Sequence, residues 1–194
     1  SSPAAASGAG AVTAVVDDMR NGAATGSAIL ALKKKGKAGD VAVKAVDIVG
    51  ADLRLFPDML VCGISFADAT GLVTLNKAAV AGKALEYECS VVIDLDGNGQ
   101  TFYSLSLTWY KEPKASPFEA SPAEDCATEV WKASSAGYSP VKAAVAASWS
   151  SPFLVFVLRD SKDLPLKRIT DRSRFSVKAY YDDGNEGMED VLDL

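Results

Sequence analysis

The sequence predicts a mainly β protein, an antiparallel β-sandwich with a flexible N-terminal arm and one or two short helices. Three observations predict this fold. Apolar or alternating segments of strand length recur from residue 40 onward. Turn residues separate these segments, most clearly Asp-Leu-Asp-Gly-Asn-Gly at residues 94–99. The chain also lacks the regular alternation of strands and long amphipathic helices that a parallel sheet requires.

The chain of 194 residues is the length of one domain. We expect two parts: residues 1–39 form an arm with an ambiguous short helix or strand, and residues 40–194 form the sandwich with an acidic C-terminal tail. Residues 1–10 are Ser, Ala, Gly and Pro only, so this segment has little to bury. Residues 28–32 suit a short helix or a buried strand equally well.

The expected strands differ in the signal that predicts them. Period-two alternation is typical of a half-buried strand, whereas a short continuous apolar segment indicates a strand buried on both faces. Residues 124–132 suit either a short helix or a strand, and residues 159–174 form a charged loop. The clearest expected strands are 40–50, 59–66, 85–94, 101–110, 153–158 and 175–181, with a short one at 72–75.

The chain contains no histidine, which removes the usual general base near neutral pH and histidine metal sites. No phosphate-binding glycine motif occurs. We therefore expect no enzyme, no cofactor and no metal site. The three cysteines lie far apart, and Cys62 and Cys89 fall in strand-like segments, which predicts buried thiols.

Paired acidic residues are the main alternative for chemistry. Glu86 and Glu88 lie two apart on an expected strand and so share one face. Two carboxylates facing a groove are what glycoside hydrolysis requires, although a solvent-facing strand is the favoured interpretation. Asp94, Asp96 and Asn98 have the spacing of a calcium loop, but its twelfth position lacks the bidentate Glu, which favours a hairpin turn. The acidic cluster at 182–186 is a further candidate for ion binding between subunits.

The net charge of −5 gives no global attraction to phosphates. Two local basic groups are candidate contacts for RNA or another polyanion, with solvated charged loops as the alternative. The longest apolar segment, 153–158, is far shorter than the roughly 20 residues that span a bilayer, so no membrane partner is expected. The candidate polyanion contacts are Lys33, Lys34, Lys35, Lys37, Arg168, Arg172 and Arg174.

Residues 151–184 combine an apolar strand at 153–158, a charged loop at 159–163, an alternating strand at 175–180 and an acidic end. This segment resembles the closing hairpin of the jelly-roll coat proteins of small icosahedral plant RNA viruses. Chain length and the small-residue arm are also similar. The resemblance implies a jelly-roll-like sandwich, assembly into a capsid and a location in the virion. Such coats often carry a strongly basic arm, whereas residues 1–10 contain no basic residue.

These observations predict a non-enzymatic structural subunit whose partners are copies of itself, of the viral coat or capsid type. The first alternative is an accessory or binding β-sandwich subunit of a larger heteromeric complex, organellar or extracellular. The second alternative is a glycan-active sandwich enzyme that uses Glu86 and Glu88.

Overall fold

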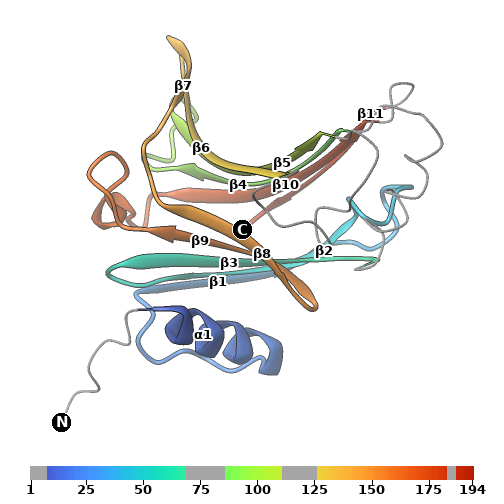
Figure 1. The fold of residues 1–194 in the computed structure, drawn as a ribbon, viewed down its shortest axis with the longest axis horizontal. Coiled ribbons are helices and arrows are strands. Elements are labelled where there is room, and N and C mark those ends of the chain that lie inside the picture. The colour runs from blue at the N-terminus through green and yellow to red at the C-terminus, as the bar shows by residue number, and fades with distance from the viewer. Residues whose placement is uncertain (1–7, 69–85, 111–125, 183–186) are drawn as a thin grey trace.

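The computed structural model describes residues 8–68, 86–110, 126–182 and 187–194. These residues form two antiparallel sheets that pack face to face, so the predicted antiparallel β-sandwich is confirmed. Figure 1 shows the six-stranded sheet above the five-stranded sheet, with the helix α1 (Ala9–Asn21) beneath the latter.

The two sheets are built from antiparallel hairpins. The five-stranded sheet has the order β1 (Leu30–Lys35), β2 (Ile48–Leu55), β3 (Met59–Phe66), β9 (Phe153–Arg159), β8 (Val145–Ser150). The six-stranded sheet has the order β11 (Gly187–Asp193), β10 (Arg174–Asp182), β4 (Glu86–Asp94), β5 (Phe102–Tyr110), β6 (Cys126–Ser134), β7 (Gly137–Pro140). The helices are α1 (Ala9–Asn21) and the short 3-10 helix η1 (Leu166–Arg168).

The jelly-roll order that the resemblance implied is not confirmed. A jelly roll is built from Greek keys, in which the chain returns across the sheet to distant strands. Here β1 to β3, β4 to β7, β8 with β9, and β10 with β11 pair in sequence within one sheet. Among the described strands, only the β3–β9 and β4–β10 pairs join strands that are not consecutive.

The main core lies between the two sheets, and alternation along the strands builds it. On β10, Phe175, Val177, Ala179 and Tyr181 are buried, whereas the residues between them are half-buried on the outer face. Opposite them, the inner face of the five-stranded sheet contributes side chains such as the fully buried Phe156. This burial of large apolar side chains is the chief stabilising contribution to the fold.

A second apolar cluster lies on the outer face of the five-stranded sheet, where α1 packs. Val15, Val16 and Met19 of the helix contact side chains of β3 and β9 there, including Val61 and Val155. The helix approaches closely because β3 has a glycine at position 63, where a Cβ would lie 3.3 Å from the sulfur of Met19. Gly22, at φ 66°, ends the helix in the left-handed conformation.

The predicted strand at 40–50 is wrong over most of its length. Residues 40–47 form turns and bends, and the strand begins only at Ile48. The Asp47 carboxylate accepts a hydrogen bond from the backbone N–H of Gly39 at 2.7 Å, which closes the loop on itself. Ala45 and Val46 are buried all the same, so the apolar pattern reported burial rather than extended backbone.

Other expectations are resolved by pairing that the local sequence does not show. Most of residues 28–32 lie in β1, so the strand alternative is right there. β1 pairs with β2, so the expected boundary at 39/40 falls between two paired strands. Residues 124–132 belong largely to β6, and the acidic tail contains β11, which pairs with β10. Residues 9 and 10, the end of the Ser, Ala, Gly and Pro segment, lie in α1. The expected strand at 72–75 and residues 1–7 fall outside the described residues.

Candidate functional site

The described strands leave four sheet edges, and three of these edge strands carry features that oppose pairing with another chain. An edge strand leaves one row of backbone N–H and C=O groups unpaired, and charge, proline or short length blocks its use by a neighbour. β1 carries three consecutive lysines, and β11 carries Glu189, Asp190 and Asp193. β7 has only four residues and ends in proline.

The fourth edge strand, β8, has none of these features. Its six residues, Val-Ala-Ala-Ser-Trp-Ser, include no charge and no proline. In the described part of the chain, its only hydrogen-bonded neighbour strand is β9. Ala146 and Ser148 are small and exposed, so their side chains add no bulk or charge to this strand. The open edge of β8 is therefore the candidate functional site.

Packing on the inner face and contacts at one end hold β8 in position. Val145, Ala147 and Trp149 pack against the main core from the inner side of the strand. At the end of the strand, Arg20 of α1 donates a hydrogen bond from Nε to the carbonyl of Ser151 at 2.8 Å, and its guanidinium also bonds the Ser150 hydroxyl. The unpaired edge is thus presented by a strand fixed to both the core and the helix.

A second candidate is a shallow groove on the outer face of the six-stranded sheet, away from the helix. Its volume is about 520 Å³. In Figure 1, β7 and the adjoining end of β6 rise from the rest of this sheet. The groove is lined by hydroxyl, carboxylate and aromatic side chains: Glu88, Ser104, Ser106, Thr108, Glu129, Trp131 and Tyr138.

Hydrogen bonds orient the polar groups of the groove. The Ser106 hydroxyl donates to Oε1 of Glu88 at 3.3 Å, and it lies 2.9 Å from the Ser104 hydroxyl. On β6, the indole Nε1 of Trp131 donates to Oε2 of Glu129 at 2.9 Å, which fixes the ring beside a carboxylate. An aromatic surface flanked by carboxylates and hydroxyls has the chemistry to bind a polyhydroxylated ligand.

Glu86 and Glu88 share the outer face of β4, as the sequence predicted. Both are half-buried, and the buried Tyr87 and Cys89 alternate with them. Only Glu88 lines the groove, where the second carboxylate belongs to Glu129. The sequence analysis missed Glu129, because it lies on β6 and reaches this face only through the pairing of Ser106 with Glu129.

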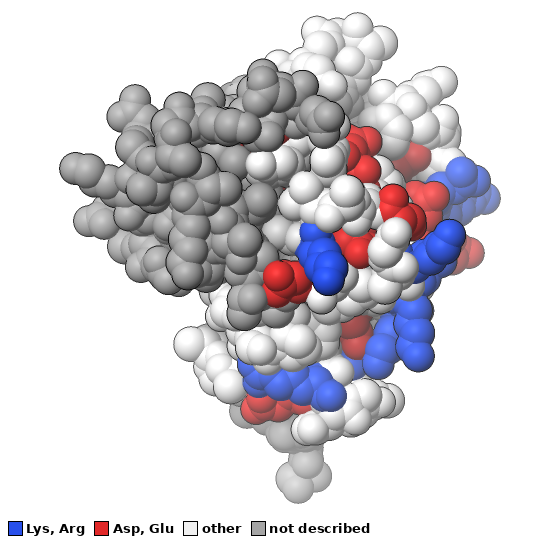
Figure 2. Space-filling view, turned by 90° about the vertical axis from the view of Figure 1, so that its right-hand side faces the viewer, with Lys and Arg blue, Asp and Glu red and all other residues white. Residues whose placement is uncertain are grey.

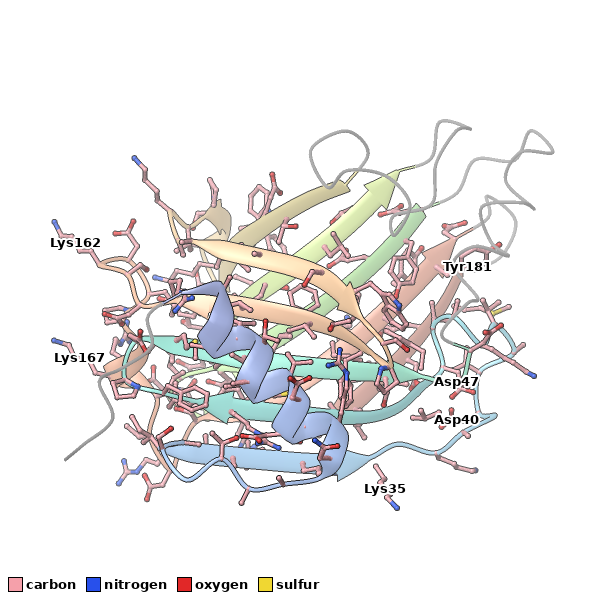
Figure 3. The ribbon with its side chains drawn as sticks, turned by 60° about the horizontal axis from the view of Figure 1, so that its bottom comes forward. Lys35, Asp40, Asp47, Lys162, Lys167 and Tyr181 are labelled. Carbon is pink, nitrogen blue, oxygen red and sulfur yellow. The ribbon has the colours of Figure 1, made fainter. Side chains whose placement is uncertain are left out.

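The structure does not bring the two basic groups together. Lys33, Lys34 and Lys35 lie on β1, and Figure 3 shows Lys35 at the opposite end of the sandwich from Lys167, which lies in η1 beside Arg168. Lys37 follows β1 in the loop, and Arg174 begins β10.

Acidic residues accompany the basic ones. Arg168 and Arg172 line a hollow together with Asp96 and Asp171. On the face shown in Figure 2, basic and acidic side chains of the described residues are likewise interspersed. The polyanion contact stays a prediction.

The turn interpretation of residues 94–99 is confirmed. The two carboxylate oxygens of Asp94 accept hydrogen bonds from the backbone N–H groups of Gly97 at 2.9 Å and Gly99 at 2.7 Å. Gly97 has a φ of 65°, which favours glycine. The Asp94 carboxylate is therefore engaged in the turn. Most of the acidic cluster at 182–186 lies outside the described residues.

The predicted burial of two cysteines is also confirmed. Cys62 and Cys89 are free thiols, and both are fully buried in the main core. Burial is the chief reason that the pKa of each thiol is raised, which keeps both protonated and unreactive. Cys126 lies in β6, but its side chain is outside the described part of the structure.

The fold of the described residues defines the class: an antiparallel β-sandwich with a helix on one outer face and, among its edge strands, one without blocking features. No protein-family model matches the chain, and no curated protein or solved structure matches it either. Among the described residues, no helix has the length and apolarity needed to cross a bilayer.

Proposed function

We propose that this chain is a structural subunit that assembles with copies of itself through the open edge of β8. The supporting observation is the contrast among the edges: β1, β7 and β11 carry blocking features, whereas β8 carries none. Antiparallel pairing of β8 with β8 of a second copy about a two-fold axis would join the two five-stranded sheets into one continuous sheet.

The finer form of the proposal is a coat- or capsid-type shell protein. Its support is the resemblance of residues 151–184 to the coat proteins. The two expected strands in this segment, at 153–158 and 175–180, fall within β9 and β10. In this form, the lysines of β1 and the arginines near η1 are the candidate contacts for RNA. The assembly proposal does not depend on this finer form.

Two lysines on β8 should abolish assembly. The double variant Ala146→Lys/Ser148→Lys places charge at two exposed positions of β8. Charged side chains, lysine above all, are what natural edge strands use to prevent pairing. We expect the wild-type chain to sediment as a dimer or a larger species at micromolar concentration. The variant should sediment as a monomer with an unchanged far-ultraviolet circular dichroism spectrum.

The matched control is Ala31→Lys, an exposed alanine on the already charged edge strand β1. This variant should assemble like the wild type. A wild-type chain that stays monomeric at about 100 μM would contradict the proposal, as would a β8 variant that assembles unchanged.

The groove supports a second candidate function, the binding of a glycan. The supporting observation is that the Trp131 indole is held beside Glu129, with Glu88 and the hydroxyls of two serines and a threonine in the same groove. This function shares its ligand class with the glycan-active alternative from the sequence, but it needs no catalytic step.

A matched pair of variants tests glycan binding. Trp131→Ala and Glu88→Gln should each weaken binding of an oligosaccharide found on a glycan array by roughly tenfold or more. Glu86→Gln, two residues away on the same face but outside the groove, should leave the affinity unchanged. Isothermal titration calorimetry measures each affinity. If no array glycan binds, or Glu86→Gln weakens binding as much as Glu88→Gln, the groove assignment is wrong.

A further inference from the structure

Three carboxylates that are distant in the sequence converge at one end of the sandwich. Asp40 and Asp47 belong to the loop between β1 and β2, and Asp190 lies on β11. One carboxylate oxygen from each lies within 4.8 Å of the other two. Figure 3 shows Asp40 and Asp47 on this loop. The two sheets thus contribute to one acidic cluster.

Asp47 makes this cluster different from a solvated acidic patch. Its side chain is buried, with only 1% of the residue exposed. The Oδ2 atom accepts a hydrogen bond from Gly39, but the buried Oδ1 atom has no hydrogen-bond partner. A buried carboxylate oxygen without a partner is costly unless a cation or a donor meets it. Among the ion pairs of the described residues, none includes Asp40, Asp47 or Asp190.

Asp190 is also held in an unusual position. It lies on the same side of β11 as Met188 and Leu192, which pack against the main core. Its Oδ2 atom accepts a hydrogen bond from the backbone N–H of Ile48 at 2.6 Å, so the carboxylate is tied to the start of β2. Burial raises the pKa of Asp190, and the negative charges of Asp40 and Asp47 add to this effect. Without a cation, the three charges oppose one another.

We propose that Asp40, Asp47 and Asp190 form a Ca²⁺ site. Carboxylate oxygens are hard ligands, and Ca²⁺ accepts six to eight of them with variable geometry. Asp40 is exposed, so the site opens to solvent and water molecules can complete the coordination. Mg²⁺ requires near-ideal octahedral geometry and gives up its water reluctantly, which suits an irregular loop less well.

The location gives the ion a structural role. Asp47 comes directly before β2 of one sheet, and Asp190 lies on the edge strand of the other, 142 residues away from Ile48 along the chain. A bound Ca²⁺ therefore links the loop at 36–47 to β11 and fastens the two sheets at this end. This site is separate from the open edge of β8, so it does not depend on the assembly proposal.

Thermal unfolding with added CaCl₂ tests the site. The full chain is first treated with EDTA and dialysed. Ligand that binds only the folded state raises stability with the logarithm of its concentration, so the Tm should rise by roughly 3–6 °C per tenfold increase in Ca²⁺ above the Kd. Calorimetric titration should give one site, and MgCl₂ should produce a smaller shift at equal concentration. No Ca²⁺-dependent shift, or an equal or larger shift with Mg²⁺, would overturn the assignment.

Three variants locate the response. Asp47→Asn and Asp40→Asn should each reduce the Ca²⁺-induced rise in Tm to under a third of the wild-type rise. If the buried substitution at Asp47 prevents folding, Asp40→Asn alone tests the site. Asp163→Asn, an exposed carboxylate in another loop, should respond like the wild type. In EDTA, Asp47→Asn should melt at or above the wild-type Tm, because the uncompensated buried charge is gone. A full Ca²⁺ response in both Asp40→Asn and Asp47→Asn would show that the ion binds elsewhere.

Discussion

Replacing Asp52 with alanine should lower the free energy of unfolding by about 3–5 kcal/mol. Asp52 and Arg54 lie on the outer side of β2, and both are nearly fully buried. The two carboxylate oxygens accept hydrogen bonds from Nε and a terminal nitrogen of the Arg54 guanidinium, each at 3.0 Å. Arg54 also donates to the Thr25 hydroxyl, which in turn donates to Asp18 of α1.

The loss is large because alanine leaves a buried guanidinium without its anion. Urea unfolding measures it, with Glu189→Ala as the control. Glu189 pairs with Lys178 at 2.9 Å, but both side chains are more than a third exposed, so that change should cost at most about 1 kcal/mol. The double variant Asp52→Leu/Arg54→Leu should recover most of the stability, since no charge is left buried. If Asp52→Ala costs no more than Glu189→Ala, the buried pair does not have the role assigned to it.

Replacing Phe156 with alanine should also cost about 3–5 kcal/mol. Phe156 is fully buried on β9, pairs in register with Cys62 of β3 and projects into the main core. Alanine removes the ring and leaves a cavity that close-packed strands on both sides cannot readily fill.

Tyr138→Ala is the matched control for this aromatic truncation. Tyr138 is 83% exposed on β7, so its loss should change stability by no more than about 0.5 kcal/mol. The midpoint of urea unfolding checks both variants at low protein concentration, where assembly does not contribute. A small effect at Phe156 would mean that the two sheets do not pack as described.

Most strands could be predicted from the sequence because their burial alternates or is continuous. The expected strand at 59–66 coincides with β3, and the segments at 153–158 and 175–181 fall within β9 and β10. The apolar pattern failed at 40–47, where Ala45 and Val46 are buried within turns. Burial without a regular backbone has no periodic signature, so sequence alone could not separate the two.

The candidate sites were harder to predict because each depends on which strands lie at edges or side by side. The composition of β8 is ordinary, and its importance comes only from its position at the end of the sheet. Glu129 joins Glu88 in the groove through β5, which lies between their strands. Asp40, Asp47 and Asp190 meet only after the two sheets pack together. Long-range pairing of this kind cannot be read from local residue patterns.

The described edge strands differ in the features that oppose edge-to-edge pairing. Lysines on β1 and acids on β11 protect the side where β11 contacts β2. On the other side, β6 contacts β8, and the short β7 is protected by its proline. If β8, the one unprotected edge among the described strands, pairs as we propose, the pairing closes on itself, whereas two unprotected edges would permit open fibres.

Hydrogen exchange of the β8 backbone amides, measured at several protein concentrations, tests the assembly proposal most directly. Amides of Val145–Ser150 that point away from β9 should exchange rapidly in dilute protein and become protected as the concentration rises and copies associate. The outward amides of β1 should exchange at the same rate throughout. If the protein associates while the β8 amides stay equally exposed, copies meet at another surface and the account of this edge is contradicted.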